Sequence, residues 1–162
     1  MASVALTALS MTIGFFFIFM GSIKLTPALN ADVYKEMRKM FIREAKVFPF
    51  VNQTGWKPNA HTYRKAVGVT EVLCGSTLAI IPGPMKEVAN LILFFEMLGA
   101  VYTHWALKEG LERMAPALVF SLLLLCRYII YLQYRAKLEE DERIEMLQQR
   151  IKLKEASEKK ED

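Results

Sequence analysis

Four apolar stretches divide the chain, near residues 4–23, 62–81, 88–107 and 115–134. Each is about 20 residues long, and a helix rising about 1.5 Å per residue needs this length to cross a hydrocarbon core of about 30 Å. The second stretch reaches it only when its helix begins near Thr62, with Arg64 and Lys65 at the membrane interface. We therefore predict an all-α integral membrane protein in which residues 1–134 form a four-helix bundle.

The first connector carries a different helical pattern. Apolar residues recur at helical spacing over residues 32–48, with Lys and Arg side chains interleaved between them. This pattern predicts an amphipathic helix that lies on the membrane surface or at the mouth of the bundle. An alternative is a helix that covers the bundle core and leaves its basic face in water.

Residues 135–162 differ from the rest of the chain, because charged residues of both signs are densely mixed there. Ile144, Leu147 and Ile151 fall on one helical stripe, which is too short an apolar repeat for a coiled coil. We expect a charged helical tail that lies in the cytosol and frays toward its end.

The composition agrees with a small membrane protein. The chain has 162 residues, of which 53% are hydrophobic, a size suited to four membrane helices with short connections. The basic residues behind its formal net charge of +4 lie in the first connector and the tail, without any nucleic-acid-binding motif. The first 23 residues lack the basic start of a cleaved signal peptide, so they predict a retained membrane helix.

Ionisable residues inside the apolar stretches are the leading candidates for function, because charge is costly in lipid. On the second helix, Gly68, Glu71 and Gly75 share one face, where the glycines would let another helix approach closely. Arg127, well inside the fourth helix, is the expected partner of Glu71 in a bidentate ion pair, whose role would be functional or simply to fix helix register. Lys24 would end the first helix with its ammonium at the interface.

A second polar stripe lies on the third helix. Glu96, Ala100 and His104 are spaced by four, so they share a face that would line a crevice or contact another protein. The dispersed carboxylates and two histidines have neither metal-ligand nor catalytic spacing, and we interpret Cys74 and Cys126 as small packing residues. We therefore expect no metal, no cofactor, no small-molecule substrate and no catalytic residue.

Three signals bear on the orientation in the membrane, and they disagree. Lys and Arg are abundant in the first connector, which favours the cytosol. Asn52-Gln53-Thr54 is a glycosylation sequon, which is used only in the lumen. Lys159 and Lys160 match the dilysine retrieval signal of endoplasmic-reticulum membrane proteins, which works only on a cytosolic tail. We favour cytosolic termini and a lumenal first connector.

Several short motifs, taken in order, carry a family resemblance. They are Gly21-Ser22-Ile23-Lys24-Leu25-Thr26-Pro27, Gly68-Val69-Thr70-Glu71-Val72-Leu73-Cys74-Gly75, Lys86-Glu87-Val88-Ala89-Asn90 and Cys126-Arg127. From about Gly14 to Ile130, this pattern resembles the endoplasmic-reticulum chaperones of nicotinic acetylcholine receptors (NACHO and its close paralogues). These proteins belong to the DoxX-like group of four-helix membrane proteins.

The resemblance implies a non-enzymatic membrane chaperone that shields the transmembrane surfaces of receptor subunits until they assemble. The pair of Glu71 and Arg127 would then shape the bundle, while Glu96, His104 and the first connector would contact the subunits. Bacterial DoxX-like proteins are linked to redox complexes, so a membrane subunit of a redox complex is an alternative. A small proton-coupled carrier is another.

Overall fold

A computed structural model describes the backbone of residues 2–49 and 51–161, and the side chains of residues 4–49, 51 and 54–154. Within this part the chain is all-helical and has no strand. Its helices are α1 (Ala2–Leu25), α2 (Ala31–Glu44), α3 (Val51–Thr54), α4 (Ala60–Ile80), α5 (Met85–Ala106) and α6 (Leu111–Glu161).

Three helices of the described chain are long and apolar enough to cross a membrane: Val4–Leu25, Met85–Ala106 and Leu111–Lys154. The remaining predicted span, residues 62–81, corresponds to α4, which has 21 residues but includes Arg64, Lys65 and Glu71. With these three charges, α4 is not among the helices of the described chain that meet the criterion of length and composition.

Local signals explain where the helices begin and end. Asn59 caps α4, because its side-chain oxygen accepts hydrogen bonds from the backbone N–H groups of His61 and Thr62. Helix α4 therefore begins two residues before the predicted Thr62, and it ends before Pro82-Gly83-Pro84, where Gly83 has a φ of 95°. In the first connector, α2 ends at Glu44 rather than at the predicted residue 48.

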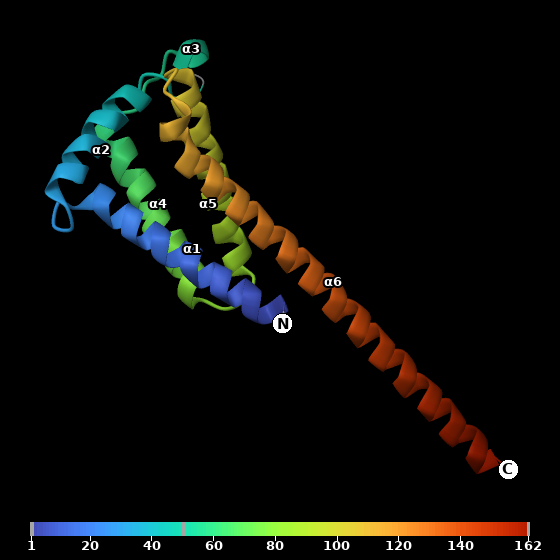
Figure 1. The fold of residues 1–162 in the computed structure, drawn as a ribbon. Coiled ribbons are helices and arrows are strands. Elements are labelled where there is room, and N and C mark those ends of the chain that lie inside the picture. The colour runs from blue at the N-terminus through green and yellow to red at the C-terminus, as the bar shows by residue number, and fades with distance from the viewer. Residues whose placement is uncertain (1, 50, 162) are drawn as a thin grey trace.

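The helices pack in two antiparallel pairs, α1 with α4 and α5 with α6 (Figure 1). Glycines make the first contact very close. A Cβ atom added at Gly14 would lie 2.6 Å from the Gly75 carbonyl oxygen, and one added at Gly21 would lie 2.7 Å from the Gly68 carbonyl oxygen. Gly68 and Gly75, the residues predicted to permit a close approach on α4, thus lie in this contact with α1.

Buried apolar side chains join the two pairs. Ile13, Phe17, Leu78, Leu93 and Leu124 are almost fully buried and belong to one cluster. Because these residues come from α1, α4, α5 and α6, the cluster forms a common core. Helix α2 packs against α4 and α1, beside this core rather than inside it (Figure 1).

Helix α6 is far longer than the others. It has 51 residues and continues without a break from its apolar first part into the charged tail. Figure 1 shows the second part of α6 extending well beyond the other helices. The boundary expected between residues 134 and 135 is therefore a change in composition, with no break in the helix.

Candidate functional site

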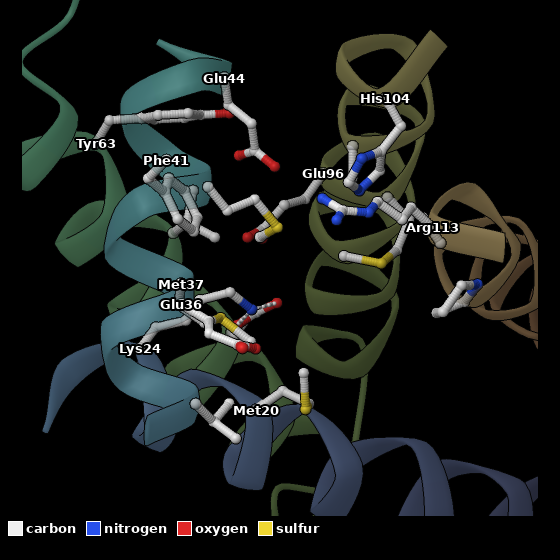
Figure 2. A pocket seen from close by; sticks show the side chains of 18 of the residues that line it. Met20, Lys24, Glu36, Met37, Phe41, Glu44, Tyr63, Glu96, His104 and Arg113 are labelled. Atoms are coloured by element: carbon white, nitrogen blue, oxygen red, sulfur yellow. Dashed lines mark hydrogen bonds and ion pairs between the residues drawn. The ribbon is translucent and has the colours of Figure 1, made fainter. Parts of the chain in front are cut away.

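The helices enclose a cavity of about 1010 Å³, which we call the central cavity. Residues of α1, α2, α4, α5 and α6 line it, and Figure 2 shows side chains from α2 and α5 facing each other across it. Four of the predicted site residues line this cavity: Lys24, Glu71, Glu96 and His104. Arg127 does not line it. The structure thus brings four of the predicted polar residues together around one cavity and places Arg127 elsewhere.

Glu71 is paired with Lys24 rather than with Arg127. The Lys24 ammonium lies 2.7 Å from Glu71 Oε1 and 2.5 Å from Oε2, and both residues are buried. Side chains on a helix tilt toward its N-terminus, so Lys24 reaches back from the end of α1 to the depth of Glu71. The Lys24 ammonium, predicted to lie at the membrane interface, is thus buried inside the bundle beside Glu71.

Arg127 forms a second buried ion pair at another level of the bundle. Its two terminal nitrogens each lie 3.0 Å from an oxygen of Glu87, and its Nε donates a hydrogen bond of 2.8 Å to Ser10 Oγ. The bidentate geometry that we predicted for Arg127 is present, but the carboxylate is Glu87 at the start of α5.

The distance along α1 explains why the predicted Glu71–Arg127 pair does not form. The Glu71 Cβ lies beside Gly21, whereas Arg127 hydrogen-bonds to Ser10. These two residues of α1 are eleven positions apart, which corresponds to about 16 Å along the helix. An arginine side chain cannot span this distance, so each charge pairs with a residue at its own level.

Arg64 supports the pair of Lys24 and Glu71 from the connector side. Its guanidinium is fully buried and donates a hydrogen bond to the backbone carbonyl of Lys24, at the end of α1. It also donates to the Tyr34 hydroxyl at 3.1 Å and lies 4.6 Å from the centre of the Tyr34 ring. Since Tyr34 lies on α2, Arg64 connects α1, α2 and α4. Arg64 was predicted to lie at the membrane interface; the structure adds that its side chain is buried among these helices.

A residue that the sequence analysis missed, Glu109, connects three helices at the mouth of the central cavity. Its Oε2 lies 2.7 Å from Nδ1 of His104, and its Oε1 lies 2.8 Å from Arg43 and 3.2 Å from Arg113. These partners belong to α5, α2 and α6. Because Glu109 lies in a short polar turn, its spacing from them along the chain gave no signal.

Two carboxyl groups at this mouth have shifted pKa values in opposite directions. Burial raises the pKa of Glu44, and the positive charges of His104 and Lys24 only partly offset this effect. Burial also acts to raise the pKa of Glu109, but the hydrogen bond to His104 and the charge of Arg43 outweigh it. The pKa of Glu109 is therefore lower than usual, and this carboxylate stays charged at neutral pH.

Glu96 occupies an unusual position in the central cavity. Both of its carboxylate oxygens are buried, and neither has a hydrogen-bond partner in the part of the chain that the structure describes. Figure 2 shows its side chain extending from α5 into the space in front of α2. The predicted stripe therefore separates into two environments, because His104 is bound to Glu109 whereas Glu96 is left without a partner.

The remaining predicted residues lie elsewhere. Cys74, predicted to be a small packing residue, is buried in the core cluster, whereas Cys126 is exposed on α6. The side chains of Asn52, Lys159 and Lys160 lie outside the described residues. In the described part of the chain, no group of three His, Cys, Asp or Glu side chains is placed to hold a metal ion.

Comparison with known proteins identifies the family to which this chain is related. The model of the DoxX-like family matches residues 8–126. A protein of Xenopus tropicalis named novel acetylcholine receptor chaperone is 41% identical over 128 residues, which cover 79% of this chain and 78% of that protein. Proteins of the same name from Macaca fascicularis and Mus musculus are 40% and 39% identical over 128 residues, which cover 79% of this chain and 75% of each.

The matched region includes most of α1, all of α4 and α5, and the first part of α6. It contains Lys24, Glu71 and Glu87, whereas Arg127 lies one residue beyond it. The resemblance inferred from the short sequence motifs is thus confirmed over most of the chain. This chain is an all-helical membrane protein that belongs to the DoxX-like family.

Proposed function

We propose that this chain is a non-enzymatic membrane chaperone that promotes the folding, assembly and surface delivery of nicotinic acetylcholine receptors. The observation that carries the proposal is the identity of about 40% over 128 residues with proteins named acetylcholine receptor chaperones. The chaperone shields transmembrane surfaces of receptor subunits until another subunit replaces it.

The described helices supply suitable surfaces for this task. Large apolar side chains are exposed on the outer faces of α5 and α6, among them Phe95, Tyr102, Val119 and Leu122. The buried ion pairs hold the helices that carry these faces in a fixed arrangement. Receptor subunits would contact these faces together with the first connector.

We further propose a four-span topology in the endoplasmic-reticulum membrane. In this arrangement α1, α4, α5 and the first part of α6 cross the bilayer, and α2 is an amphipathic helix at its lumenal surface. The burial of Arg64 and the pairing of Glu71 with Lys24 support α4 as a span, because they reduce the cost of its charges in lipid. Both termini then lie in the cytosol.

Co-expression with a nicotinic receptor subunit that assembles poorly alone tests the proposed activity. Surface ligand binding is measured in cells that express the subunit with this chain, or with an unrelated endoplasmic-reticulum membrane protein at equal amount. We expect surface binding to rise only with this chain. The absence of a rise for several different subunits would contradict the proposal.

Two sets of variants show whether the ion pairs take part. Glu71→Gln and Arg127→Leu each break a buried pair, whereas Glu139→Gln removes an exposed charge of the tail and serves as the control. All are compared at equal protein amount. If only the buried-pair variants lose the rise in surface binding, the pairs support the chaperone activity; if all keep it, the pairs serve the fold alone.

A further inference from the structure

The central cavity has the size and the apolar lining of a small-molecule site. Its volume of about 1010 Å³ lies at the upper end of the range of about 300–1,000 Å³ that is typical of ligand pockets. Phe16, Phe17, Met20, Met97 and Phe120 form its apolar wall. These side chains would bury the hydrocarbon body of a ligand.

Away from the exposed rim of the cavity, the described cations that line it have carboxylate partners, but the Glu96 carboxylate has no cation partner among the described residues. Lys24 is paired with Glu71, and Arg43, Arg113 and His104 all contact Glu109. Lys39 and Glu36 also line the cavity, but both are exposed to solvent at its rim. The Glu96 carboxylate is left with no hydrogen bond or ion pair to the described residues. The inner part of the cavity therefore has an excess of carboxylate over available cations.

Solvent does not offset this excess. The side chains of Arg43 and Arg113 are 46% and 57% exposed, so water screens their charges. The Glu96 oxygens, in contrast, are buried, and Glu44 beside the mouth is only 5% exposed. A buried carboxylate without a counter-charge is costly, and a bound cation would remove this cost.

Aromatic rings complete the site. Phe41 and Tyr63 line the cavity on the side of α2 and α4, and Tyr63 lies within electrostatic reach of both Glu44 and Glu96. Figure 2 shows Phe41, Tyr63, Glu44 and Glu96 around the same space. Aromatic faces attract organic cations, so the rings and the carboxylates favour the same kind of ligand.

We propose that the central cavity binds a small amphipathic amine, whose ammonium group pairs with Glu96 and whose apolar body lies against Phe17, Met20 and Phe120. The proposal rests on the cavity, its lining and the unpartnered carboxylate. It does not depend on the proposed chaperone activity, and a failure of either leaves the other in place.

Three probes that differ only in their polar group test the charge preference. The full chain is placed in nanodiscs of phosphatidylcholine, and its unfolding midpoint is measured with 4-phenylbutylamine, 4-phenylbutanol or 4-phenylbutyrate at pH 7.5. We expect the amine to raise the midpoint by about 3 °C or more near saturation, and the alcohol and the acid to raise it by less than about 1 °C.

Variants locate the site. Glu96→Gln keeps the shape of the side chain but removes its charge, and we expect it to weaken amine binding by about tenfold or more. Glu36→Gln, at the exposed rim of the same cavity, is the matched control and should change affinity by less than about twofold. Ala100→Leu narrows the cavity without changing any charge, and it should also weaken binding.

Some results would overturn the proposal or its assignment to Glu96. Equal shifts with all three probes would mean nonspecific partitioning and would overturn the proposal. An amine preference that survives in Glu96→Gln, or that is lost equally in Glu36→Gln, would overturn the assignment to Glu96. Glu96→Gln is expected to fold, because it replaces a buried carboxyl group that has no partner among the described residues by an amide of the same shape, and its own unfolding midpoint without probe checks this.

Discussion

At the scale of single residues, the interior of the bundle is organised by two buried ion pairs at different levels. Lys24 and Glu71 are 7% and 2% exposed, and Arg127 is only 1% exposed. Removing one partner of such a pair leaves the other charge buried and unpaired, whereas removing both charges need not destabilise the protein. The stability of the protein is therefore expected to fall when one partner of a pair is removed alone.

Lys24→Met tests this directly. We expect it to lower the free energy of unfolding by about 3–5 kcal/mol, because the Glu71 carboxylate then lacks its counter-charge. The double variant Lys24→Met with Glu71→Leu should regain most of this loss. Unfolding of the purified protein in detergent by denaturant measures both, with Lys35→Met as a control on an exposed lysine. A double variant no more stable than the single one would refute the pairing.

The residues in this interior could be chosen from the sequence, but their partners could not. Glu71, Arg127 and Lys24 were singled out because charge is rare in apolar helices. The pairing of Glu71 with Arg127 was wrong, because it depends on the relative depth of two helices that the sequence does not give. Glu109 was missed for a related reason: it lies in a polar turn, where a carboxylate is ordinary.

At the scale of helices, the structure depends on the close contact of α1 with α4 and on the attachment of α2 at the cavity mouth. The apolar pattern predicted all the long helices, and their ends differ by a few residues because caps such as Asn59 lie outside the apolar stretches. The packing of the helices needed three-dimensional information. Each contact leads to a separate prediction.

Gly75→Ala should weaken the contact of α1 with α4. The added Cβ would lie 2.7 Å from the Gly14 carbonyl oxygen, so the backbones must separate, at a cost of about 1–3 kcal/mol. Gly99→Ala is the matched control, because nothing lies within 4 Å of its added Cβ, and it should stabilise α5 by up to about 1 kcal/mol. Thermal unfolding of both variants measures the difference, and equal midpoints would show that the contact adjusts freely.

Glu109→Gln should loosen α2 in a pH-dependent way. The pKa of Glu109 is lower in the folded state than its usual value of 4.5, so its contribution to stability is present above that value. It disappears as the pH falls through the lower folded pKa. We expect the variant to be less stable than wild type by about 1–3 kcal/mol at pH 7, with a gap that closes below pH 4.5.

The control for Glu109 is Glu139→Gln, which removes an exposed carboxylate bound only to Arg135 among the described residues. It should change stability by less than about 0.5 kcal/mol at any pH. A gap between wild type and Glu109→Gln that stays constant between pH 7 and pH 3.5 would contradict the role of the charged carboxylate.

At the scale of the whole molecule, the proposed topology places the first connector and the tail on opposite sides of the membrane. Replacing Lys159 and Lys160 by alanine should then move part of the protein from the endoplasmic reticulum to the cell surface, because the retrieval receptor reads these two lysines. Replacing Lys152 and Lys154 removes the same charge and should leave the location unchanged. Surface biotinylation measures both, and equal surface fractions would contradict the signal.

Because α6 is one continuous helix, the number of residues between the bundle and the far end of the tail sets both the distance of that end and the direction that it faces. Residues 135–161 continue the helix of the apolar part, and 27 residues correspond to about 40 Å of stiff rod. Inserting two residues after residue 136 would lengthen this rod by only about 3 Å but turn everything beyond it by about 200°. A flexible tail would not transmit such a rotation to its far end. Any partner that engages the tail and the bundle together would therefore respond to the helical phase between them.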